Sequence, residues 1–244
     1  MRAAMPRPER GFTVIELMIA TAIFLVICGA MFGLLQLSQQ KYSSETQVSG
    51  AFQETRLAID QIVRDFNVSG YPSQTIFSQL PGNSTQYVTS PVAWSPNYPG
   101  NPCLVGTAGG GTCATPGDFD LILETDLGNG VSWIRYQLIG NILFRSVVPK
   151  TAGTDPAAPP VDPTVVVPFL TNVMNSPTQP IFKFTCDTPT GPQPCSATVN
   201  FGVPNRIRDV DILLIVMTRQ PDLQTGKPKV VELQGRGHRL NPSN

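Results

Sequence analysis

The sequence predicts an α+β protein in which one long N-terminal helix packs on an antiparallel β-sheet head. The first observation is an apolar run over residues 12–37, and crossing a bilayer takes roughly 20 such residues. The second is a three- and four-residue spacing of apolar positions that continues the helix to about residue 68. The third is a change to strand-like alternation after residue 70, with frequent Pro and Gly. The natural organisation is one globular domain behind a membrane anchor.

The charges place the anchor and exclude one class of partner. Arg2, Arg7 and Arg10 precede the apolar run with Glu9 as the only acid, which predicts a cytoplasmic N-terminus and an outward-facing head. The run is longer than the roughly 7 to 15 apolar residues of a cleavable secretory signal, so it predicts an uncleaved anchor. Over the whole chain, 17 basic residues balance 17 acidic residues, and no nucleic-acid partner is expected.

Glu16 is the only charged residue between Phe12 and Leu37. A carboxylate in hydrocarbon costs several kcal/mol, so an intramembrane acid indicates a functional contact with a partner. Residue 12 lies four positions earlier, the spacing at which side chains meet on a helix. The alternative is that Glu16 lies at the membrane surface and extends its carboxylate into water.

The segment Gly11-Phe12-Thr13-Val14-Ile15-Glu16-Leu17, after Arg10 and before the apolar run, closely resembles the class III signal of type IV pilins and type II secretion pseudopilins. The resemblance implies a leader over residues 1–11, which a prepilin peptidase removes by cutting between Gly11 and Phe12. It also implies methylation of the new Phe12 amine, and docking of Glu16 on the Phe12 amine of a neighbouring subunit. The implied fold is pilin-like, with a transmembrane half-helix over 12–37, an amphipathic half over 38–70 and a periplasmic head over 71–244.

Apolar residues in the second half of the helix predict the face that meets the head, namely Val48, Phe52, Ile59, Ile62, Val63 and Phe66. Gly70 followed by Tyr71-Pro72 predicts the end of the helix. In the anchor, Gly29 and Gly33 form a weak G-x-x-x-G pattern for close helix approach. Major pilins often carry a proline where this chain has Gly33, and this departure favours a minor subunit.

The head is predicted to be mostly loop over 71–117, and residues 149–164 are predicted to form a surface loop or linker. Positive-φ residues at Gly128-Asn129-Gly130 and Gly140-Asn141 predict hairpins in an antiparallel meander. The predicted strands are 119–124, 131–138, 142–148, 165–169, 181–185, 198–201, 209–218 and 229–233.

Four of the five cysteines lie outside the anchor, which contains Cys28, and four cysteines allow three pairings. We favour the local pairs Cys103–Cys113 and Cys186–Cys195, because each would order a loop, and disulfides indicate an oxidising periplasm. The spacing within each pair is too long for a structural zinc site.

Catalytic signatures are missing: the sequence has no H-E-x-x-H, no G-x-S-x-G and no Walker loop. His238 is expected to be solvated beside Arg236 and Arg239 near an exposed C-terminus. The acids Asp118, Asp120, Glu124 and Asp126 could collect calcium, but the favoured interpretation is the wet face of a strand. The sequence therefore predicts a structural protein, not an enzyme, and no cofactor or metal.

Residues 56–72, and the strand over 210–217 with its turn at Thr225-Gly226, resemble PilW-type minor pilins. Such a subunit initiates or caps a type IV pilus, at the bacterial inner membrane and then in the filament or its tip.

The strand-turn-strand over 136–145 resembles J-class type II secretion pseudopilins, the close alternative. The implied partners are prepilin peptidase, other minor and major pilins or pseudopilins, the inner-membrane assembly platform and membrane lipid. An anchored tip adhesin is a further alternative, with 71–117 and its aromatics Tyr87, Trp94 and Tyr98 as contact surface.

Overall fold

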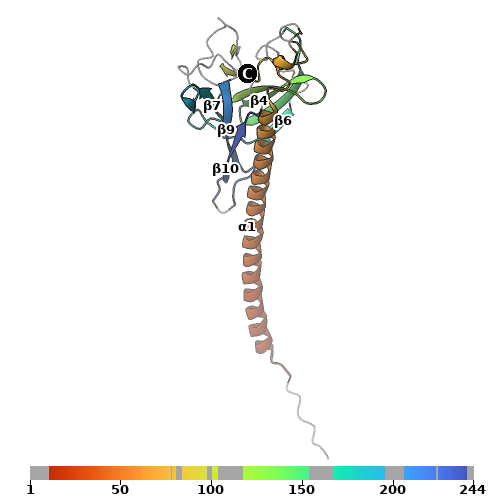
Figure 1. Cartoon of the computed structure of the whole chain (residues 1–244). Coiled ribbons are helices and arrows are strands. Elements are labelled where there is room, and N and C mark those ends of the chain that lie inside the picture. Colours follow the sequence, from red (N-terminus) through yellow and green to blue (C-terminus); the bar gives the residue numbers. More distant parts are fainter. Residues whose placement is uncertain are drawn as a thin grey trace, which may run out of the picture.

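In the computed structural model, a long helix carries a head made of two antiparallel sheets at its C-terminal end (Figure 1). The structure describes residues 11–77, 79–80, 84–97, 101–103, 118–153, 167–195, 206–223 and 225–240, without the side chains of 94–97 and 101–103. This arrangement of one long apolar helix on antiparallel sheets is the α+β, pilin-like architecture that the sequence predicts.

Helix α1 (Val14–Val68) is continuous over 55 residues, which corresponds to roughly 80 Å at 1.5 Å per residue. It passes through Gly29 and Gly33 without a break. It ends where the sequence predicts: Ser69 is the C-cap residue, with its hydroxyl donating to the Phe66 carbonyl at 2.8 Å, and Gly70 adopts a φ of 90° that favours glycine.

The larger sheet has six strands in the order β2-β1-β3-β4-β5-β6. Their bounds are β2 Asn101–Cys103, β1 Val92–Asn97, β3 Asp120–Asp126, β4 Val131–Ile139, β5 Ile142–Pro149 and β6 Val167–Thr171. The smaller sheet has the order β10-β9-β7-β8, with β10 Val230–His238, β9 Ile207–Met217, β7 Phe182–Thr188 and β8 Gly191–Pro194. A short 3-10 helix, η1 (Gln74–Phe77), follows the end of α1.

Most predicted strands match observed ones: β3, β4, β5, β6, β7, β9 and β10 lie at the predicted positions. Gly128, Gly130 and Gly140 have positive φ angles in the predicted hairpin connections. The predicted strand over 198–201 and most of the predicted loop over 149–164 lie outside the described residues. Within 71–117, predicted to be mostly loop, the structure has β1 and β2, and β1 joins β3 through Val92 and Ala93 alone. A pairing over two residues is too short to produce the apolar and polar alternation from which a strand is predicted.

The second half of α1 packs mainly on β10 and β9. Its buried residues are Thr55, Ala58, Ile59, Ile62, Asp65 and Phe66. Phe52 was predicted to face the head but is 43% exposed, because it lies about one turn before Thr55, the first buried residue of α1. Two glycines of β10 permit the close approach. A Cβ at Gly235 would lie 2.2 Å from Ile59 Cγ2, and one at Gly237 would lie 2.9 Å from Phe66 Cδ1.

Candidate functional site

The start of α1 places Glu16 in a capping box with Thr13, the N-cap residue. The Glu16 amide donates to Thr13 Oγ1 at 3.3 Å, and the Thr13 amide donates to Glu16 Oε2 at 2.9 Å. The Thr13 hydroxyl also donates to Glu16 Oε2, at 2.9 Å. Such a reciprocal pair satisfies backbone donors that the first turn of a helix otherwise leaves without partners.

Thr13 was not among the predicted site residues. The pattern T-x-x-E over residues 13–16, directly before an apolar run, is the sequence signal that predicts this cap. The cap gives Glu16 a local role within its own chain. Phe12, immediately before the cap, is 90% exposed, so its position is open to a neighbouring molecule.

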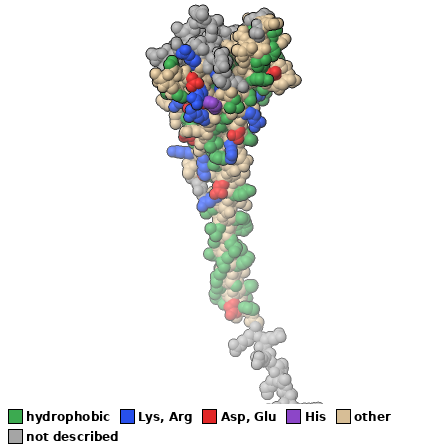
Figure 2. Space-filling view, viewed as in Figure 1, with side chains coloured by type: hydrophobic (Ala, Val, Ile, Leu, Met, Phe, Trp, Pro, Cys, Tyr) green, Lys and Arg blue, Asp and Glu red, His purple; other side chains and the backbone are tan. Residues whose placement is uncertain are grey.

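Between the cap and Leu37, the first half of α1 presents apolar side chains on all sides, and none of them packs on the head. By length and composition this first half of the helix can cross a membrane. Figure 2 shows hydrophobic side chains along this part and charged side chains on the upper helix and head. Cys28, in the anchor, is half-buried on this helix and does not form a disulfide.

Residues 6–32 match the family model of the prokaryotic N-terminal methylation motif. No curated protein matches the chain. The match covers the predicted cleavage position, the exposed Phe12, the Thr13–Glu16 cap and most of the apolar run. This prepilin-type signal, followed by a long apolar helix, supports a type IV pilin-like protein and indicates anchoring in a membrane. It also indicates a structural subunit that is processed by prepilin peptidase and assembles with other pilins.

Within the head, a polar cluster holds the end of α1 against the larger sheet. This Asp65 cluster consists of Gln61 and Asp65 on α1, Tyr136 on β4 and Arg145 on β5. The Tyr136 hydroxyl donates to Asp65 Oδ2 at 2.5 Å, and Arg145 Nη2 donates to the same oxygen at 2.9 Å. Gln61 Nε2 donates to Asp65 Oδ1 at 2.7 Å. Burial and the adjacent Asp65 carboxylate raise the pKa of Tyr136, so its hydroxyl stays protonated and keeps donating.

The acids of β3 do not form the wet face that the sequence predicts. Asp120 and Glu124 are buried, and each meets a cation: Asp120 Oδ2 lies 2.6 Å from Arg135 Nη2, and Glu124 pairs with Lys150. Asp126 Oδ1 instead accepts hydrogen bonds from the amides of Gly128 and Gly130 in the following turn. Among the residues that the structure describes, no three His, Cys, Asp or Glu side chains gather as a metal site would require.

The Glu124–Lys150 pair is fully buried and fully hydrogen-bonded. Glu124 accepts from the amides of Thr89 and Ser90, at 3.2 and 2.9 Å. Lys150 Nζ donates to the Tyr87 carbonyl at 2.8 Å and to Thr89 Oγ1 at 2.9 Å. Burial raises the pKa of Glu124, while the Lys150 ammonium opposes that shift. The pair ties residues 87–90 to the larger sheet, so these contacts order part of the long segment after α1.

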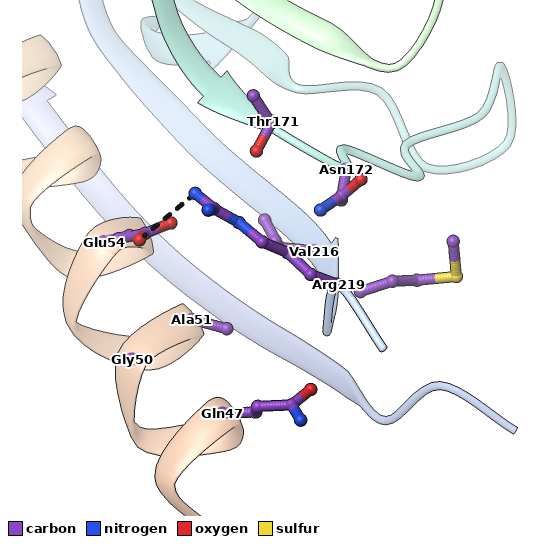
Figure 3. A pocket seen from close by; sticks show the side chains of 9 residues that line it. Gln47, Gly50, Ala51, Glu54, Thr171, Asn172, Val216 and Arg219 are labelled. Atoms are coloured by element: carbon purple, nitrogen blue, oxygen red, sulfur yellow. Dashed lines mark ion pairs between the residues drawn. The ribbon is translucent and has the colours of Figure 1, made fainter. Parts of the chain in front are cut away.

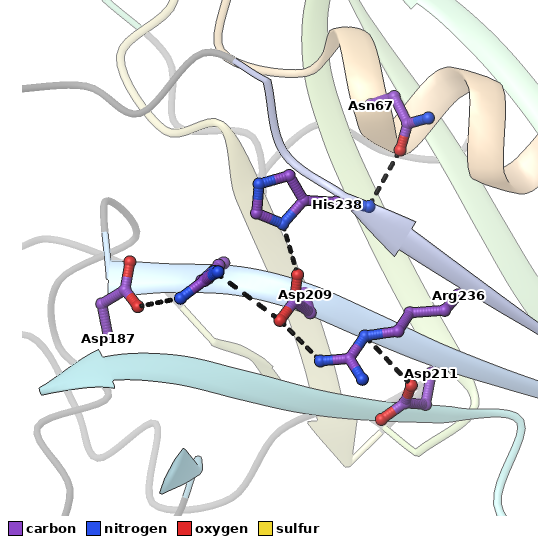
Figure 4. A network of polar contacts seen from close by, with 7 residues as sticks. Asn67, Asp187, Asp209, Asp211, Arg236 and His238 are labelled. Atoms are coloured by element: carbon purple, nitrogen blue, oxygen red, sulfur yellow. Dashed lines mark hydrogen bonds and ion pairs between the residues drawn. The ribbon is translucent and has the colours of Figure 1, made fainter. Parts of the chain in front are cut away.

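His238 is exposed, as predicted, but its ring is also paired with a carboxylate. His238 Nδ1 lies 2.5 Å from Asp209 Oδ1, and Arg236 Nη2 lies 2.7 Å from Asp209 Oδ2 (Figure 4). The His238 amide donates to the Asn67 side chain, which links β10 to the end of α1. The Arg239 side chain is buried. The start of β9 and the end of β10 therefore carry a charge network built around Asp209.

Cys186 on β7 and Cys195 after β8 form a disulfide with their Cα atoms 5.1 Å apart, which is the favoured local pairing. The other favoured pair cannot be placed, since Cys113 and the Cys103 side chain lie outside the described part of the chain. Of the aromatics considered for a contact surface, Tyr87 is buried, while Tyr98 and the Trp94 side chain are not described.

A pocket of about 190 Å³ lies between α1 and the end of β9, lined in part by Gln47, Gly50, Asn172 and Met217. Figure 3 shows Arg219 reaching across it from the β9 side toward Glu54 on α1. Their charged atoms lie 3.6 Å apart, and both side chains are exposed. An exposed pair of this kind contributes little stability, so we assign this pocket to the packing of β9 along the helix.

Proposed function

We propose that this chain is a processed, membrane-inserted minor pilin that helps to initiate or cap a type IV pilus. The observation that carries the proposal is the prepilin-type signal over residues 6–32, which leads directly into the exposed apolar half of α1. A subunit of this kind acts by assembly. Its anchor holds it in the inner membrane until extraction, and its head contacts other subunits.

In this proposal the leader is residues 1–11, and prepilin peptidase cuts between Gly11 and Phe12 on the cytoplasmic side. The new amine of Phe12 is then methylated. The exposure of Phe12 supports access for both reactions. The Arg2, Arg7 and Arg10 side chains before the apolar run favour a cytoplasmic N-terminus, with residues 71–244 in the periplasm.

Docking would pair Glu16 of one subunit with the Phe12 amine of a neighbour in the filament. The pairing is favourable because the carboxylate is otherwise an uncompensated charge in hydrocarbon. Glu16 lies on the exposed part of α1, and its one described side-chain partner is Thr13 of its own cap. A cap leaves carboxylate lone pairs available, so Glu16 can serve both contacts.

In-cell chemical cross-linking of the full chain, followed by mass spectrometry of the captured partners, tests this proposal. Capture of minor and major pilins together would support it. Capture of type II secretion pseudopilins would instead assign the chain to a J-class position, since both kinds of subunit share the signal. Capture of a surface ligand, with no filament subunit, would favour an anchored tip adhesin.

The processing step has its own test. Substituting Gly11 with a bulky residue, such as Gly11→Leu, should leave the leader attached, because we expect the peptidase to require a small residue at the cleavage site. Intact-mass measurement of the membrane-extracted protein would show the full chain. Loss of residues 1–11 in the Gly11→Leu variant would place the cleavage position elsewhere.

A further inference from the structure

The connection between β9 and β10 extends along α1 toward the anchor. Ser44 Oγ donates to Asp222 Oδ2 at 3.2 Å, and Gln47 Nε2 donates to Gln220 Oε1 at 3.3 Å. A small cavity nearby is lined by Gln40 and Ser43 of α1 together with Asp222 and Leu223 of the connection. This turn is therefore held beside the part of α1 that begins near residue 40.

The apolar run of α1 ends at Leu37, three residues before Gln40. Three residues advance a helix by roughly 4.5 Å. A bilayer with a hydrocarbon core of about 30 Å measures about 40–45 Å with its headgroups, which leaves about 5–7 Å of headgroup layer on each side. With the apolar run in the hydrocarbon, Gln40 lies within that layer, and Ser44, which binds Asp222, lies roughly 10 Å beyond Leu37. The turn at Asp222 and Leu223 therefore lies at the outer boundary of the headgroup layer.

The side chains at this height suit such a layer. Leu223 is 68% exposed at the turn, although it is a large apolar residue. Lys227 on the same turn and Lys41 on α1 are exposed cations, and Tyr42 beside Lys41 is 74% exposed. An apolar side chain flanked by lysine and tyrosine is the composition of segments that lie in a membrane interface.

We propose that the β9–β10 turn is a second membrane contact, in which Leu223 enters the headgroup layer of a phospholipid surface. Lys41 and Lys227 then meet lipid phosphates. The contact holds the head at one height and orientation above the membrane while the subunit awaits assembly. This inference rests on the membrane insertion of α1 in the proposed function.

Photocross-linking of the full chain, reconstituted in vesicles of phosphatidylethanolamine and phosphatidylglycerol, tests this contact. The photoreactive residue p-benzoylphenylalanine replaces Leu223 in one variant. It replaces Phe24, in the apolar half of α1, in a second. A third carries it at Thr190, an exposed position in the connection between β7 and β8, at the end of the smaller sheet remote from the turn. Mass spectrometry then identifies lipid adducts on each variant.

Lipid adducts at positions 24 and 223, and none at 190, are the expected result. Adducts at 24 alone would overturn the second contact and leave the anchor of the proposed function intact. Equal yields at 223 and 190 would also overturn it, because the head would then be touching lipid without a preferred face. Absence of adducts at all three positions would overturn this inference and membrane insertion together.

Discussion

Glu16 has one role in the cap of α1 and one proposed role in docking, and a single substitution can separate them. As the acid of the capping box it stabilises the first turn of α1. As a charge it would attract the amine of a neighbouring subunit. Glutamine retains the capping geometry but removes the charge, whereas alanine removes both.

We expect Glu16→Gln and Glu16→Ala to be cleaved normally and to be strongly depleted from sheared filaments. Incorporation relative to wild type is measured by immunoblotting of sheared and cell-bound fractions. Thr13→Ala is the matched control, since it weakens the cap and keeps the charge, and it should incorporate nearly as wild type does. Normal incorporation of Glu16→Gln would show that assembly does not need the charge of Glu16.

Gly235 shows how a residue that usually weakens a strand can be required by packing. Its missing Cβ makes room for Ile59, whose Cγ2 would otherwise lie 2.2 Å away. We expect Gly235→Ala to lower the free energy of unfolding by about 1–3 kcal/mol, as overpacked sites do. Urea denaturation of the full chain in detergent measures this change.

Gly50→Ala is the control for that experiment. Gly50 lies on α1, and a Cβ there would meet nothing within 4 Å. Alanine favours a helix over glycine by about 0.5–1 kcal/mol, so this variant should be slightly more stable than wild type. If both variants shifted the free energy of unfolding equally, the close contact at Gly235 would not be the cause.

At the scale of elements, the Asp65 cluster joins α1 to β4 and β5. Removing the Tyr136 hydroxyl leaves the Asp65 carboxylate with fewer donors in a buried place. We expect Tyr136→Phe to cost about 1–3 kcal/mol of stability, measured by thermal or urea unfolding. Tyr42→Phe, at an exposed tyrosine on α1, should change the free energy of unfolding by less than about 0.5 kcal/mol. A neutral result for Tyr136→Phe would mean that the aromatic ring alone carries the contact.

The Asp209 network predicts a dependence on pH in the contact between β9 and β10. Burial acts to raise the pKa of Asp209, but hydrogen bonds from His238 and Arg236 outweigh it and hold the pKa below its ordinary value. A folded-state pKa below the unfolded one means that the stabilisation is present above about pH 4 and is lost as the pH falls further.

We therefore expect Asp209→Asn to be less stable than wild type near neutral pH, with the difference shrinking as the pH falls below about 4. Unfolding curves of both proteins over this pH range give the comparison. Asp211→Asn is a suitable control, because Asp211 is exposed and its ion pair with Arg236 is longer, at 3.7 Å. A difference that grew in acid would mean that folding raises the pKa of Asp209 instead of lowering it.

At the scale of the whole molecule, the helices and strands with a regular spacing of apolar residues were predictable, but the contacts between these elements were not. The helix, its end at Gly70 and seven strands follow from spacing and turn residues. The burial of Asp120 and Glu124 does not, because Arg135 and Lys150 reach them from other parts of the chain. Sequence alternation shows which residues share a face of a strand, but not which element covers that face.

The end of β10 was missed for a related reason. Gly235 and Gly237 lower strand propensity, so the strand pattern alone ended near Leu233, yet the strand continues to His238 and these glycines leave room for α1. At the candidate site, the resemblance of the signal indicated Gly11, Phe12 and Glu16. Thr13 was readable from the T-x-x-E spacing alone.

The main partner of the inner face of α1 is β10, the last strand of the chain. Synthesis therefore delivers Ile59, Ile62 and Phe66 long before the strand that covers them. Until residues 230–238 are synthesised, the upper half of the helix has an uncovered apolar side, which is the kind of surface that chaperones and proteases recognise. A chain cut short before β10 would keep the N-terminal signal motif and the apolar half of α1 but would leave Ile59, Ile62 and Phe66 uncovered, and we expect such a chain to be degraded faster than the full chain.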